Sequence, residues 1–161
     1  MPELLPGPIA LGKMVASLLG RRVMFRQAPS GLMVEYRNHD LYTGLYITGL
    51  RAISTIVCCD KAFAANSAAA LAMISAERAA EWLEAGSLPQ DATENFHEIL
   101  NVMAVALNET NGKNPVSLKE VLPPGTPIPS SVLVVNRVTQ RADYIVEIQG
   151  YPDGQVAILI L

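Results

Sequence analysis

Charged residues are scarce in this sequence, and neither sign dominates. Only 17% of its 161 residues are charged, and 12 Lys and Arg against 15 Asp and Glu leave a formal net charge of -3. A surface that binds nucleic-acid phosphates needs a concentration of positive charge that this balance does not supply. The one cationic cluster, Arg21, Arg22 and Arg26, is typical of a solvated strand edge. We therefore expect no nucleic-acid partner.

Long hydrophobic runs and a leader sequence are also missing. The apolar stretches at 53–59 and 62–74 are broken by polar residues before they reach the ~20 residues that a bilayer span needs. The N-terminal segment MPELLPGPIALG has Glu3 and three prolines where a signal peptide carries positive charge and then an apolar run. The sequence therefore predicts no membrane association and no export, and hence a cytoplasmic protein.

Cysteine is limited to the adjacent pair Cys58 and Cys59. Neighbouring residues in a strand point to opposite faces, so a disulfide between them would need a strained geometry. We expect two reduced, buried thiols. The two histidines, His39 and His97, lie far apart in the sequence, and no further cysteine completes a zinc site, so we expect no structural metal.

Hydrophobic residues make up 50% of the chain, which at this length predicts a single folded domain spanning 1–161, with 1–20 as a flanking N-terminal helix. Asp60 and Ser75 are predicted to cap helices. Three hairpins are predicted, and they join 22–27 to 32–37, 41–48 to 52–59 and, through a turn at 151–154, 144–149 to 155–161. Helices are predicted at 9–19, 63–74, 76–84 and 92–108, and the remaining strands at 116–121, 132–138, 144–149 and 155–161.

The predicted helix 92–108 has an unusual outer face. Polar residues opposite a buried face are what any solvated surface helix shows. Here, however, Val102 and Val105 lie in or beside the polar stripe, and exposed apolar residues flanked by Glu and Asn are typical of a contact surface. On a wheel of about 100° per residue, the stripe contains Glu94, Glu98, Asn101, Val105 and Asn108.

The spacing of Glu98, Asn101 and the distant Pro124 resembles the signature of the CheC/CheX/FliY family of chemotaxis phosphatases. The order of elements over about 42–135 is similar to that of a CheX-like domain. The resemblance implies an α+β fold in which helices cover a largely antiparallel sheet. The sequence departs from the family pattern at Glu94, where Asp or Ser is usual, and at Val105 and Ala106, where a small residue and a second Asn are usual.

The same resemblance implies a function and a set of roles. The substrate would be a phosphorylated receiver domain of a response regulator, which carries an acyl phosphate and supplies its own Mg²⁺, so that the protein needs no cofactor of its own. Asn101 would position the attacking water and Glu98 would pair with a receiver lysine. Pro124 is predicted to be structural. The remaining candidates for partner binding are Glu94, Val102, Val105 and Asn108.

Several alternatives remain open from the sequence. A CheX-like domain that lacks catalysis and acts as a binding or scaffolding module would explain the same helix. The segment His97-Glu98-x-x-Asn101 is one residue away from a zinc-binding HExxH helix, but Asn is a poor zinc ligand. The resemblance also implies a homodimer paired through the sheet, and the apolar run at 156–161 is explained equally well by an unprotected edge strand or a buried central strand.

Overall fold

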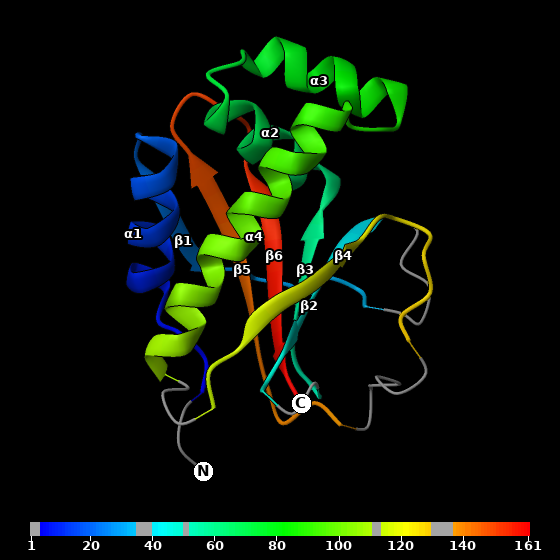
Figure 1. Ribbon diagram of the computed structural model, residues 1–161. Coiled ribbons are helices and arrows are strands. Elements are labelled where there is room, and N and C mark those ends of the chain that lie inside the picture. Colours follow the sequence, from blue (N-terminus) through cyan, green and yellow to red (C-terminus); the bar gives the residue numbers. More distant parts are fainter. Residues whose placement is uncertain (1–3, 35–39, 50–51, 111–113, 130–136) are drawn as a thin grey trace.

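The computed structural model describes residues 4–34, 40–49, 52–110, 114–129 and 137–161. These residues form an α+β fold in which helices pack on a mixed-order antiparallel sheet (Figure 1). None of the helices in these ranges is long and apolar enough to cross a bilayer. The elements are α1 (Pro8–Leu19), β1 (Val23–Gln27), β2 (Leu41–Ile47), β3 (Ile53–Asp60), α2 (Lys61–Leu71), α3 (Ala76–Ala85), α4 (Gln90–Thr110), β4 (Ser117–Leu122), β5 (Gln140–Ile148) and β6 (Gly154–Ile160).

The strands run in the order β1-β5-β6-β3-β2-β4, and every neighbouring pair is antiparallel. The predicted hairpins of β2 with β3 and of β5 with β6 are confirmed. The predicted hairpin between 22–27 and 32–37 is wrong, because β1 pairs with β5 instead. The segment after the turn is held by side chains rather than by a ladder: Asp143 accepts the Leu32 N–H and Arg141 donates to the Leu32 carbonyl. Residues 35–37 lie outside the described ranges.

Two of the helices begin at the side-chain caps that the sequence predicts. Asp60 caps α2 and Ser75 caps α3 through their side-chain oxygens, as predicted. Helix α2 ends at Leu71 rather than at residue 74, because the chain turns at Met73, whose φ of 59° is left-handed. Strand β5 begins at Gln140, earlier than predicted. Of the strand predicted at 132–138, residues 137 and 138 are not in a strand and 132–136 lie outside the described ranges.

Strand β6 lies in the middle of the sheet, between β5 and β3. The interpretation of 156–161 as an unprotected edge is therefore wrong, and burial on both sides explains its apolar run. The edges are β1 and β4, so the arginine cluster does lie at a strand edge, where Arg26 pairs with Glu147 at 3.1 Å. The homodimer stays a prediction that no longer has this run as support.

Two apolar layers cover the two faces of the sheet. The larger core lies between the sheet and helices α1, α2 and α4, and a smaller cluster lies on the opposite face. The adjacent thiols separate as predicted, with Cys59 in the larger core and Cys58 in the smaller cluster, both free and buried. Burial raises the pKa of Cys58 to about 12 and that of Cys59 well above its ordinary value, so both remain protonated thiols.

Close contacts at two glycines fix helices over the sheet. A Cβ at Gly154 in β6 would lie 2.6 Å from the Cα of Phe63 in α2. A Cβ at Gly44 in β2 would lie 3.1 Å from a methyl group of Leu100 in α4. Because these two glycines have no side chain, α2 and α4 can pack close to the sheet. The close packing of α4 in turn positions its outer face.

Candidate functional site

Helix α4 crosses the helical layer (Figure 1). Aromatic packing holds it near its first turns. The Phe96 ring meets Tyr42 and Phe63 edge-on, with ring centroids 5.2 and 6.2 Å away. Such edge-to-face pairs are favourable and fix the rotation of the helix about its axis. The buried face continues through Ile99, Leu100, Met103, Ala106 and Leu107. The opposite face is therefore turned outward.

A hydrogen bond from the sheet also reaches the main chain of α4. The hydroxyl of the fully buried Tyr46 donates to the carbonyl oxygen of Leu100, the residue directly before Asn101. Burial raises the pKa of Tyr46 well above its ordinary value, so the hydroxyl keeps its proton and remains a donor. This contact could not be predicted from the sequence, because the pattern marks Tyr46 only as an apolar strand residue. This hydrogen bond therefore anchors the helix turn that carries Asn101 to strand β2 of the sheet.

The structure places Glu94, Glu98 and Asn101 on the exposed face of α4, with Val102 beside them half-buried. Glu94 accepts a hydrogen bond from Gln90 at 3.2 Å. Within the described part of the chain, the side chains of Glu98 and Asn101 have no hydrogen-bond or ion-pair partner. Both can therefore be offered to another molecule, although their catalytic roles stay predictions.

Val105 extends this face by one turn, with 50% of its surface exposed. A half-exposed valine beside Asn101 and Glu98 forms a small apolar patch with the neighbouring Val102, as the sequence pattern predicts. An apolar patch with a polar border is the composition of many protein contact surfaces. We call Glu98, Asn101, Val102 and Val105 the α4 face.

Asn108 lies on the same side of the helix but is used within the chain. Its Nδ2 donates to the Val116 carbonyl at 3.0 Å, and its Oδ1 accepts the Val116 N–H at 2.7 Å. These two bonds hold the start of β4 against the end of α4. The helical wheel placed Asn108 with the polar stripe and could not show its contact with Val116. Its predicted role in partner binding stays untested, and both halves of its amide already have partners.

Pro124 occupies a tight turn after β4. The Thr126 N–H donates to the Pro123 carbonyl at 3.2 Å, and Gly125 has a φ of 88°. Proline at the second position and a left-handed glycine at the third are the requirements of a type II turn. The residue thus has the structural role that the sequence suggests for it.

The described residues contain no group of three or more His, Cys, Asp and Glu side chains that could hold a metal ion. His97 is exposed on α4, and His39 lies outside the described ranges. The zinc-helix alternative therefore has no ligand set to support it among the residues described.

Comparisons with known proteins place this fold. No family model matches the sequence. No curated protein matches it either. Among solved structures, FliY of Thermotoga maritima aligns with a TM-score of 0.61 at 18% identity, covering 96% of this chain and 85% of FliY. CheX of Vibrio vulnificus aligns with a TM-score of 0.56 at 11% identity, covering 95% of each chain. This chain has the CheC/CheX/FliY-type fold.

The same fold occurs in proteins of different kinds. The FliM–SpeE complex from H. pylori contains a chain that aligns with a TM-score of 0.67 at 11% identity, covering 95% of this chain and 80% of that one. A FliG–FliM complex from H. pylori also aligns, at 14% identity. The predicted resemblance is confirmed at the level of the CheC/CheX/FliY-type fold, and at these identities the exposed side chains must decide the function.

Proposed function

We propose that this protein is a phosphatase that hydrolyses the aspartyl phosphate of a response-regulator receiver domain, in two-component or chemotaxis signalling in the cytoplasm. The observation that carries the proposal is the exposed amide of Asn101, which follows the exposed carboxylate of Glu98 by one helical turn on a helix anchored from the sheet. Neither side chain has a partner among the described residues. The CheC/CheX/FliY-type fold supports the same assignment.

The reaction needs little from the phosphatase beyond placing a water. The oxygen of water attacks phosphorus as the bond between phosphorus and the aspartyl oxygen breaks, which yields the free aspartate and dihydrogen phosphate. The amide of Asn101 offers both a donor and an acceptor, so it can orient the attacking water without removing its proton. Correct placement of this kind is a major source of rate acceleration in phosphoryl transfer.

The neighbours of Asn101 suit docking. Glu98 would pair with a receiver lysine, a charge-assisted contact that fixes the register of the two proteins. Val102 and Val105 would bury apolar surface beside it, and Glu94 would extend the contact by one turn. In this scheme the receiver holds the Mg²⁺ that stabilises its acyl phosphate, and the protein itself supplies only side chains.

The decay of acyl phosphate on purified receiver domains tests the proposal. We expect the first-order decay of ³²P-labelled receiver to speed up with increasing protein, with the label released as inorganic phosphate. Unchanged decay for every receiver of the same genome, at protein concentrations where binding is saturated, would contradict the proposal.

A noncatalytic interaction domain is the second candidate, because Val105, with 50% of its surface exposed, would contribute to a contact surface whether or not the partner is dephosphorylated. Val105→Asp places a charge in the apolar patch, so we expect binding of a receiver or other partner to weaken about tenfold, as for loss of a contact-centre residue. Calorimetry with wild type and variant measures the change. Glu109→Asp on the exposed end of α4 is the control. Equal affinities for Val105→Asp and wild type would exclude Val105 from the interface.

A further inference from the structure

Helix α3 lies at one end of the helical layer, at the top of the view in Figure 1. Its one buried residue, Ala79, packs against Ala65 and Ala69 of α2. On a wheel of about 100° per residue, the side of α3 opposite Ala79 is centred near Glu81, whose side chain is exposed. No residue on that side is buried, so α3 has an outer face that the rest of the described chain does not cover.

Three carboxylates form a row along this outer face. Glu77, Glu81 and Glu84 are all exposed, and their spacing of four and three residues makes each the neighbour of the next on the helix surface. Like charges at this spacing repel each other and destabilise a helix. Among the described residues none of the three carboxylates has an ion-pair partner, and neither has Arg78, the one cation of α3. The chain itself therefore does not relieve the repulsion.

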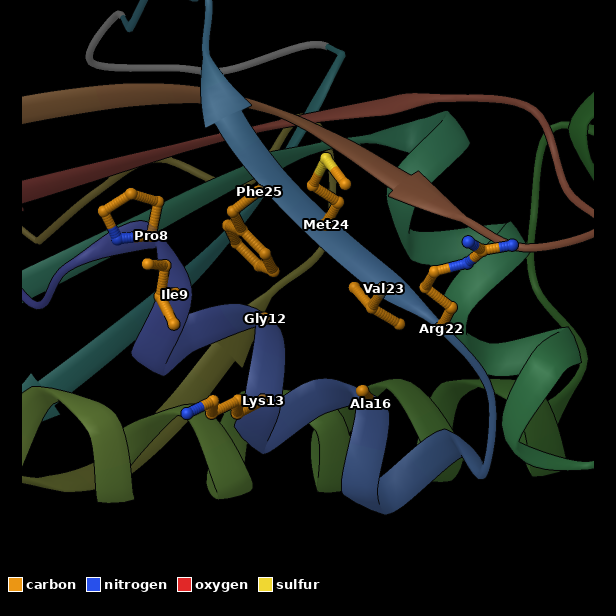
Figure 2. A pocket seen from close by; sticks show the side chains of 9 residues that line it. All are labelled: Pro8, Ile9, Gly12, Lys13, Ala16, Arg22, Val23, Met24 and Phe25. Carbon is orange, nitrogen blue, oxygen red and sulfur yellow. The ribbon is translucent and has the colours of Figure 1, made fainter.

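Negative charge is concentrated in this part of the chain. Residues 76–110, from the start of α3 to the end of α4, contain seven Asp and Glu and one Arg, a formal charge of -6, whereas the rest of the chain carries +3. Cations on other elements include Lys13 and Arg22, which line a groove between α1 and β1 (Figure 2). Arg26 and Arg141 are paired with carboxylates. A charge separation of this size attracts and orients a partner whose surface is basic.

Apolar side chains border the carboxylate row. The exposed Ala80 and Ala85 flank it on its two sides. Met73 lies just before the Ser75 cap of α3 with 86% of its surface exposed, and its φ of 59° is left-handed, where glycine or asparagine is usual after a helix. Methionine is common on surfaces that bind partners, because its flexible side chain adapts to the contact. The outer side of α3 therefore combines negative charge with apolar surface.

We propose that the outer side of α3 docks an amphipathic basic helix of a partner protein. Lysine or arginine side chains of that helix would pair with the three carboxylates and remove their mutual repulsion. A helix matches this surface, because residues at i, i+4 and i+7 form a ridge along which a second helix packs. No residue of the α4 face takes part, so the proposal holds whether or not the protein is a phosphatase. We call Glu77, Ala80, Glu81, Glu84 and Ala85 the α3 face, and the partner helix would also cover Met73 at its end.

The probe is a capped peptide of about 18 residues whose helical wheel has lysines on one side and leucines and alanines on the other. NMR titration into the ¹⁵N-labelled full chain gives the Kd and the amides that respond. We expect the largest shift changes within residues 76–85, and a Kd that rises about tenfold between about 50 and 300 mM NaCl, because salt screens exposed charges. A peptide of the same composition in scrambled order, which forms no amphipathic helix, should bind about fivefold more weakly or not at all.

Paired variants separate the α3 face from general charge effects. Glu81→Gln with Glu84→Gln removes two charges from the row, and Glu109→Gln with Glu120→Gln makes the same change of net charge at exposed positions on α4 and β4. Glu77 is retained, because a carboxylate in the first turn also stabilises the helix. We expect the first pair to raise the Kd of the peptide about tenfold and the second pair to leave it nearly unchanged. Since the first pair lowers the repulsion along α3, it should unfold at the same temperature as wild type or higher.

A third variant tests the apolar part of the contact. Glycine adopts the left-handed backbone without strain, so Met73→Gly removes the exposed side chain and should leave the midpoint of thermal unfolding unchanged or raised. We expect the Kd of the peptide to rise about threefold. A Kd equal to that of wild type would contradict the apolar contact and, with it, an amphipathic occupant.

Three further results would overturn the proposal. The first is no binding of the amphipathic peptide at millimolar concentration, and the second is an equal loss of affinity in the two paired variants. The third is a set of shift changes confined to α4, since the basic helix would then dock on the α4 face instead.

Discussion

Replacing Asn101 by alanine is expected to remove most of the acceleration of receiver dephosphorylation, by roughly 100-fold in the catalysed rate constant. The amide would otherwise hold water in line with the leaving oxygen, and alanine has no polar group to do so. Docking should survive, because the rest of the α4 face is unchanged. Single-turnover decay at increasing protein concentration separates the maximal rate from the half-saturating concentration.

Two controls make this result specific. Alanine has the highest helix propensity, so Asn101→Ala should not destabilise α4, and a urea titration checks this. Asn95→Ala makes the same substitution on a half-buried position elsewhere in α4 and should leave the rate unchanged. A variant Asn101→Ala that retained the full maximal rate would remove Asn101 from the mechanism, whereas a change confined to the half-saturating concentration would assign it to docking.

Replacing Gly154 by alanine is expected to destabilise the fold by about 3 kcal/mol. The added Cβ would lie 2.6 Å from the Cα of Phe63, and the obstruction is main chain rather than the end of a flexible side chain. Relief therefore requires α2 to move away from β6, which disturbs the larger core. The free energy of unfolding from urea titrations of the variant and wild type measures the change.

Gly49→Ala is the matched control, because a Cβ there would meet nothing within 4 Å. We expect its stability to stay within about 0.5 kcal/mol of wild type, the usual range for surface substitutions. Similar losses for the two variants would show that the cost comes from glycine replacement in general and not from the contact between α2 and β6.

Local signals in the sequence predicted the helices and two of the five strand pairings described, β2 with β3 and β5 with β6. Side-chain caps such as Asp60 and Ser75 act within a few residues, so their effect can be read from the sequence. The β2–β3 hairpin is equally local. The partner of β1 could not be read in this way, because Arg26 meets Glu147 across a separation of 121 positions and no short-range rule connects them. The chain does bend at 29–30, as the turn residues at 28–31 predict, but the residues that follow are bound to Asp143 of β5 rather than paired with β1.

The candidate site was predictable in outline because it lies on one helix. A period of 3.6 residues places Glu98, Asn101 and Val105 on one side whatever the tertiary structure. The tertiary contacts of that helix were not predictable. The hydrogen bond from Tyr46 to the Leu100 carbonyl does not follow from periodicity, and neither do the two hydrogen bonds between Asn108 and Val116. Each of them depends on another element reaching the helix.

The central position of β6 has a consequence for how this chain folds. Strand β3 can pair with β2 as soon as both have left the ribosome, but its other neighbour, β6, is synthesised much later. Pairing between distant segments slows folding, because a long loop must close before its contacts form. Until then, one side of β3 has unpaired main-chain groups, and its buried residues, including Val57 and Cys58, face water. We therefore expect the β2–β3 hairpin to form early and β6 to complete the sheet last, by joining β5 on one side to β3 on the other.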